Sequence, residues 1–224
     1  MSTIATQLSA ELAEPVQLRV IPALDERNRL TTAFRLILAI PHLVLVGGPV
    51  AGALSWAWSD DSARHANWAA DGGALGAVAG LAAVIAWFAI VFTGHHPDGL
   101  WKLAAFYLRW RVRAIAYVAL LRDEYPPFGD GVYPASLVLA SPTAPRDRLG
   151  VAFRLILVIP QLLAIWAISI AWGVTTAIAW FSILITGRYP APLYDFAVSA
   201  LRWNLRVEAY LLLLTDRYPP FSLA

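Results

Sequence analysis

Two pairs of arginines recur at helical spacing in this chain of 224 residues. Arg109 and Arg113 lie one helical turn apart, and Arg202 and Arg206 repeat that spacing 93 positions later. Residues four apart share a helix face, so each pair would present two guanidinium groups side by side. Such a pair can hold an anionic lipid headgroup or another phosphate through bidentate hydrogen bonds. The four arginines are therefore candidates for lipid or partner binding.

A tryptophan follows the first arginine of each pair, at Trp110 and Trp203. Tryptophan and arginine together are typical of helices at the headgroup level of a membrane, so both tryptophans join the binding candidates. The other explanation is structural. The arginines would then tie their helices to the rest of the fold, through carboxylates such as Asp123 and Asp216.

Two further arginines, Arg35 and Arg154, lie near the beginning of long apolar stretches. A charge inside a membrane segment indicates function by default. Both residues are also close enough to the end of their segment for the side chain to snorkel to the interface. Both explanations remain open at this point.

The one metal-like group in the sequence is formed by His95, His96 and Asp98. Imidazole and carboxylate groups could bind zinc or iron, but adjacent histidines rarely chelate one ion. The chain has no cysteine, which excludes thiol catalysis and cysteine-ligated metals. No nucleophile stands at a telling spacing from a base. We expect no metal, no cofactor and no catalytic residue.

Composition predicts an integral membrane protein. Hydrophobic residues make up 59% of the chain and charged residues 14%, against about 25% charged in an ordinary soluble domain. Stretches without Asp, Glu, Lys or Arg cover 36–59, 72–97 and 155–187, and a spanning helix needs roughly 20 apolar residues. The net charge of +2 gives no support for nucleic-acid binding.

An internal duplication organises the chain. Three groups of motifs recur in order: Arg-Leu to Ile-Pro at 29–41 and 148–160, Trp-Phe to Thr-Gly and Pro at 87–97 and 180–190, and Tyr-Pro-Pro-Phe at 125–128 and 218–221. The offset falls from 119 to 93, so the first copy carries 26 extra residues between Pro41 and Trp87.

The duplication predicts an all-α integral membrane protein with two tandem parallel repeats. Each repeat would be a transmembrane helical hairpin plus a cytoplasmic interfacial helix, preceded by a short extended lead-in segment that could pair with the other. The charge-free run at 155–187 is divided into a hairpin to match the first copy, although one long tilted helix is the alternative. The predicted N-terminal tail covers 1–13. Repeat 1 is predicted at 14–130, with membrane helices at about 31–58 and 74–94 and an interfacial helix at about 100–121. Repeat 2 is predicted at 131–224, with membrane helices at about 150–168 and 171–187 and an interfacial helix at about 193–214.

The distribution of basic residues predicts the orientation. Of 17 Lys and Arg residues, only Arg64 falls on the side of the hairpin tips. By the positive-inside rule, both termini and both arginine-rich helices would be cytoplasmic, in a multi-pass protein of the bacterial plasma membrane.

The ordered motifs resemble the domain-of-unknown-function 4389 family, an uncharacterised family of bacterial membrane proteins, here as a tandem pair over about residues 14–224. The resemblance implies a repeated membrane architecture and supplies no catalytic residue. The extra segment of the first copy has no counterpart in the second.

We expect a non-enzymatic membrane module: an accessory or scaffold subunit of a membrane complex, or a protein that interacts with anionic lipid. The expected partners are the lipid bilayer, an anionic lipid and a larger membrane complex. A small transporter or channel is the second hypothesis, and a metal-dependent membrane enzyme is the third.

Overall fold

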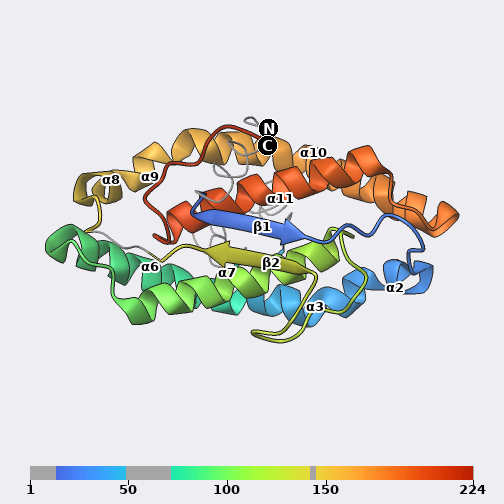
Figure 1. Ribbon diagram of the computed structural model, residues 1–224, viewed down its shortest axis with the longest axis horizontal. Coiled ribbons are helices and arrows are strands. Elements are labelled where there is room, and N and C mark those ends of the chain that lie inside the picture. The colour runs from blue at the N-terminus through green and yellow to red at the C-terminus, as the bar shows by residue number, and fades with distance from the viewer. Residues whose placement is uncertain (1–13, 49–71, 142–144, 224) are drawn as a thin grey trace, which may run out of the picture.

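The computed structural model describes residues 14–48, 72–141 and 145–223. The described part is mostly helical and contains a two-stranded sheet (Figure 1). Its elements in chain order are β1 (Val16–Val20), α2 (Arg29–Ala33), α3 (Arg35–Val46), α6 (Gly73–Thr93), α7 (Asp98–Val118), β2 (Ala135–Leu139), α8 (Arg148–Ala152), α9 (Arg154–Leu157), α10 (Ile159–Thr186) and α11 (Ala191–Leu211).

Repeat 2 contains one long helix where the sequence predicts a hairpin. Helix α10 continues through the expected turn at 169–170 without a break, and together with α9 it forms an apolar helix of 33 residues, about 50 Å long. Buried side chains recur along one face of α10, from Gln161 to Ile183. The hairpin prediction is wrong here because Gly173 costs a helix only about 1 kcal/mol, whereas a tight turn would leave helix-end backbone groups without partners.

Repeat 1 does not contain the predicted hairpin either. Three contacts follow one another along α7: Tyr107 with Gly76, Arg111 with Val46, and Tyr117 with Arg35. Going along α7 from its N-terminus, the contacts are made first by α6 and then by the end and the beginning of α3. Helices α3 and α6 therefore lie end to end beside α7, in the opposite direction. The offsets of the duplication lead to the same arrangement. The equivalents of Val46 and Gly73 in repeat 2 are residues 165 and 166, which are adjacent within α10.

The extra segment of repeat 1 therefore interrupts a helix that is continuous in repeat 2. We call α2, α3 and α6 rod 1, and α8, α9 and α10 rod 2. Figure 1 shows the two rods extending along the long axis of the molecule, with α2 and the end of α10 at one end and α8 and the end of α6 at the other. The part of the first predicted membrane helix from 49 to 58 lies outside the described residues.

The lead-in segments pair, as predicted. Strands β1 and β2 are antiparallel, with Leu18 opposite Leu137 and Val16 opposite Leu139. Strand β1, from repeat 1, packs on α11, whereas β2, from repeat 2, packs on α7. Each repeat thus contributes a strand to the other, and the two repeats interlock into one unit.

Helices α7 and α11 form the core and are not interfacial helices. Nearly every residue of α7 from Ala104 to Tyr117 is buried, and α11 is buried at alternate positions along its second half. The rods cover one side of these helices and the strands another. On these helices, Arg111, Arg113 and Arg206 bind partners inside the fold.

The outer faces of both rods are apolar and exposed. Two helices, Gly73–Thr93 and Arg154–Thr186, are long and apolar enough to cross a membrane, with 28% and 22% of their most apolar windows buried. The core helix of a soluble protein would be mostly buried. Large exposed side chains on the rods include Leu30, Phe34, Ile40, Val44, Leu81, Ile85, Phe88, Phe92, Leu149, Phe153, Ile159, Leu163, Trp166, Ile170, Val174, Ile178, Phe181 and Ile185.

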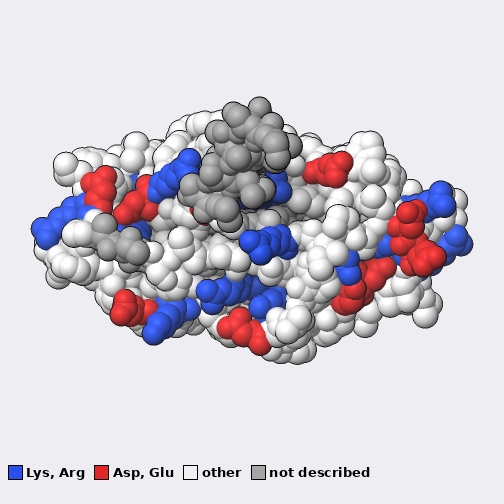
Figure 2. Space-filling view, in the orientation of Figure 1, with Lys and Arg blue, Asp and Glu red and all other residues white. Residues whose placement is uncertain are grey.

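Charged side chains lie elsewhere on the surface. Figure 2 shows Lys, Arg, Asp and Glu over the sheet and at the two ends of the long axis. Along β1, buried Val16 and Leu18 alternate with the more exposed Gln17 and Arg19, so the outward face of β1 is polar.

Candidate functional site: internal arginine clusters

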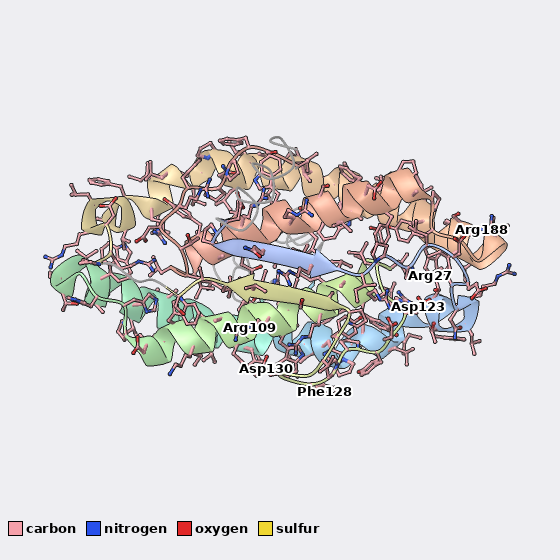
Figure 3. All side chains as sticks on the ribbon, viewed as in Figure 1. Arg27, Arg109, Asp123, Phe128, Asp130 and Arg188 are labelled. Carbon is pink, nitrogen blue, oxygen red and sulfur yellow. The ribbon has the colours of Figure 1, made fainter. Side chains whose placement is uncertain are left out.

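The end of α7 holds a buried cluster of two arginines around one carboxylate. Arg27 donates through Nε to Asp123 Oδ2 at 2.8 Å and through Nη2 to Oδ1 at 2.7 Å, and Arg35 donates to the same Oδ1 (Figure 3). The guanidinium of Arg35 also lies 4.6 Å from the ring centre of Tyr117. Both arginine side chains are 1% exposed.

Repeat 2 has the same cluster at the opposite end of the molecule. Arg146 Nε lies 2.7 Å from Asp216 Oδ2, and Arg154 Nη2 donates to Asp216 Oδ1 at 2.7 Å. The guanidinium of Arg154 lies 4.2 Å from the ring centre of Tyr210. The equivalent residues therefore play equivalent roles in the two repeats.

A strained leucine completes each cluster. Leu120 and Leu213 adopt positive φ values of 64° and 61° just after α7 and α11, a conformation that is uncommon for residues other than glycine. Their carbonyl groups accept from Arg27 Nη2 at 2.6 Å and from Arg146 Nη2 at 2.7 Å. The buried charge–carbonyl hydrogen bonds offset the backbone cost, which is of order 1 kcal/mol.

Arg35 and Arg154 therefore point into the fold and do not snorkel. Sequence reasoning missed their partners Arg27 and Arg146. The signal was present, because both stand two residues before the Arg-Leu motif at an offset of 119.

The cluster around Asp123 predicts how stability depends on pH. Burial alone would raise the pKa of Asp123, but the hydrogen bonds and charges of Arg27 and Arg35 outweigh it and lower the pKa to about 2 from its ordinary value of 3.8. A carboxyl group with a lowered pKa stabilises the fold above its unfolded-state pKa and loses that contribution as the pH falls. We expect about 2 kcal/mol of stability to be lost between pH 3.8 and about 2.

Asp123→Asn should remove this part of the acid sensitivity. The measurement is the free energy of unfolding in mild detergent at a series of acidic pH values, for the wild type and the variant. Parallel pH profiles for the two proteins would show that Asp123 does not carry the effect.

The predicted tryptophans are also part of the internal structure. Trp110 Nε1 donates to His42 Nδ1 at 3.1 Å, and the His42 ring stacks on Phe128 at 4.4 Å between ring centres. In repeat 2, Trp203 Nε1 donates to Gln161 Oε1 at 2.8 Å. His42 and Gln161, which follow Pro41 and Pro160 at equivalent positions, thus accept the same hydrogen bond in the two repeats.

Arg111 joins the two repeats at the middle of the molecule. Its Nε donates to Glu208 Oε2 at 2.9 Å, and Tyr107 donates to Glu208 Oε1 at 3.1 Å. Arg111 also donates to the carbonyl of Val46, at the end of α3. A carboxylate of α11 is thus held by two side chains of α7.

The predicted lipid-binding arginines divide into two kinds. Arg113 is buried, donates to the carbonyl of Gly129 and lies 3.4 Å from Asp130. Arg206 lies 3.2 Å from Glu14. Arg109 and Arg202 are half-buried and have no hydrogen-bond or ion-pair partner among the described residues.

The histidines of the weak metal candidate engage their own backbone. His95 Nδ1 lies 2.9 Å from the carbonyl oxygen of Thr93, and His96 Nδ1 lies 3.0 Å from that of Pro97. Within residues 14–48, 72–141 and 145–223, no three His, Cys, Asp or Glu residues are grouped to hold a metal ion.

These observations define a mostly helical protein of two interlocked repeats, in which the recurring polar residues build the fold. The chain belongs to the family described as a domain of unknown function (DUF4389), whose model matches residues 71–129 and 148–222. The two matched segments agree with the tandem arrangement. No curated protein and no solved structure matches the chain.

Proposed function

We propose that this chain is a non-enzymatic membrane module that lies in one leaflet of a bilayer, with its long axis parallel to the membrane plane. The outer faces of rods 1 and 2 would enter the apolar region, and the sheet would face water. The module would serve as a scaffold or accessory subunit, with the bilayer and a larger membrane complex as its partners.

The observation that carries this proposal is the direction in which the surface changes polarity. Exposed apolar residues run the whole length of both rods, from Leu30 to Phe92 and from Leu149 to Ile185. Charged residues also run the whole length, over the sheet and at both ends (Figure 2). The protein is therefore amphipathic across its long axis, as an interfacial membrane helix is.

The length of rod 2 supports the same arrangement. Its apolar helix of 33 residues is about 50 Å long, against a hydrocarbon core of roughly 30 Å. An upright rod would place the middle of the sheet, with the exposed Arg19, in hydrocarbon, where a charge costs several kcal/mol. A rod in the membrane plane avoids both conflicts.

The internal role of the recurring polar residues supports a non-catalytic module. The arginines, tryptophans and carboxylates that recur in both copies mainly bind one another or backbone carbonyls. Recurrence is therefore explained by the needs of the fold, and the exposed rod faces are what the module offers to lipid or to a partner subunit.

Cysteine labelling tests the arrangement on this cysteine-free chain. Gly99→Cys lies at one end, where an added Cβ meets no atom within 4 Å, and Ala191→Cys lies exposed at the other end. We expect an impermeant maleimide to label both from the same side of sealed vesicles, together with Ser136→Cys on the sheet. Labelling after detergent solubilisation is the control for reactivity.

The second arrangement, a multi-pass protein with α6 and α10 crossing the bilayer, gives the opposite result. The lengths and compositions of these two helices favour it. It places Gly99→Cys and Ala191→Cys on opposite sides of the membrane, and that labelling pattern would overturn the in-plane proposal. A substrate-dependent current in proteoliposomes would instead favour the transporter, and a stoichiometric bound metal would favour the enzyme.

A further inference from the structure

Two arginines, Arg206 and Arg217, line one pocket beside the end of α11 in repeat 2, and Arg202 lies one helical turn before Arg206. Arg202 and Arg206 lie on one face of this helix, and Arg217 follows its end. Burial lowers the pKa of Arg206, Glu14 opposes this effect, and the charges of Arg202 and Arg217 lower the pKa further. Arg206 itself lies 3.2 Å from the Glu14 carboxylate.

The pocket beside Arg206 and Arg217 is shallow. Glu14, Arg206, Thr215 and Arg217 line it. The Thr215 hydroxyl accepts a hydrogen bond from the Arg217 backbone N–H at 3.1 Å, and a hydroxyl that accepts still has its own proton to donate. The pocket offers several donors and a net positive charge. Because it is shallow, it suits a small anionic group at its rim and not a whole small molecule.

The pocket adjoins the apolar face of rod 2. Tyr218, which lines the pocket, donates through its hydroxyl to the carbonyl of Leu157 at 3.2 Å. Leu157 and the neighbouring Ile156 are exposed on α9. A group of cations at the border of an apolar membrane face lies at the level of lipid headgroups.

Repeat 1 lacks this concentration of positive charge. The residue equivalent to Arg217 is at 217 − 93 = 124, which is Glu124, and Glu124 pairs with Arg122. Asp130 accompanies Arg113, the counterpart of Arg206. Arg202 and Arg206 correspond to Arg109 and Arg113 of repeat 1, whereas Arg217 corresponds to the acidic Glu124, so the fold does not require a cation at the position of Arg217.

We propose that Arg202, Arg206 and Arg217 form a phosphate-binding site and that an anionic phospholipid headgroup supplies the phosphate. Guanidinium groups suit this ligand because their planar N–H pairs match two phosphate oxygens. The lipid source rests on the membrane arrangement proposed above, whereas the binding of phosphate by the three arginines does not.

The test compares matched pairs of substitutions in the full chain. Arg202→Gln/Arg217→Gln removes two cations from the site and leaves the contact between Arg206 and Glu14. Lys102→Gln/Arg109→Gln removes two cations from α7 of repeat 1 and is the control. Binding of inorganic phosphate is measured by calorimetry in mild detergent, and retention of phosphatidylglycerol against phosphatidylcholine is measured by mass spectrometry.

We expect the repeat 2 variant to lose both phosphate affinity and phosphatidylglycerol retention, by about tenfold or more, and the control to keep both. Glu14→Gln should change both in the opposite direction, because it removes the opposing charge. Loss of phosphate binding with unchanged lipid retention would overturn the lipid source. If all variants bind inorganic phosphate equally, the proposed site is wrong. That conclusion does not depend on the outcome of the cysteine-labelling experiment.

Discussion

Asp123→Asn should lower the free energy of unfolding by about 3 kcal/mol or more, the largest effect we expect from a single substitution. The variant keeps the size of the side chain but removes the charge that Arg27 and Arg35 share. Both guanidinium groups are 1% exposed, so water cannot replace the lost carboxylate. Removing one partner of a buried ion pair typically costs about 3–5 kcal/mol, because the other charge remains buried.

The chain offers two comparisons for this substitution. Asp216→Asn removes the equivalent carboxylate of repeat 2 and should cost a similar amount. Asp130→Asn removes a carboxylate that is 54% exposed in its pair with Arg113, and it should cost less than about 1 kcal/mol. Chemical or thermal unfolding in mild detergent measures all three. If Asp123→Asn is no less stable than Asp130→Asn, the cluster does not hold the end of α7.

Glu208→Gln should also have a large effect, a loss of about 3 kcal/mol in the free energy of unfolding, and should weaken the contact between the repeats. Arg111 and Glu208 come from different repeats and are 10% and 18% exposed as side chains. The variant leaves the Arg111 cation in the core without the Glu208 carboxylate. Tyr107, whose pKa is raised by burial and by Glu208, keeps only an amide as its acceptor.

A double variant separates charge from packing at this position. Arg111→Met/Glu208→Met removes both charges and keeps apolar bulk, and such replacements of buried pairs are often neutral or stabilising. We therefore expect the double variant to be more stable than Glu208→Gln. An additive loss in the full double-mutant cycle would show that the two side chains do not interact.

The candidate site could be predicted from the sequence only in part. The motifs identify the residues that matter in each copy, including Arg35, Trp110 and their counterparts. They do not identify the partners. Asp123 lies 96 positions from Arg27 and 88 from Arg35, and spacing along a helix reports only neighbours three or four positions apart.

The same limit applies to the arginine stripes. Helical spacing correctly places Arg109 with Arg113 and Arg202 with Arg206, one pair on each of two helices. Whether a stripe faces lipid, water or the core depends on what packs against the helix. The structure places α7 and α11 in the core, where Arg111, Arg113 and Arg206 are paired with carboxylates inside the fold.

The sequence by itself determined the duplication, the family, the pairing lead-in strands and the apolar character of the long helices, because each is written in local pattern and composition. Tertiary structure decided that each predicted hairpin is a rod and that the strands are exchanged between the repeats. The physical reason is that a charge-free run predicts an apolar helix but carries no local pattern that shows whether the helix continues or turns. The choice depends on what the faces of the helix contact: α7 packs against α3 and α6 of rod 1, and α11 packs against α10 of rod 2.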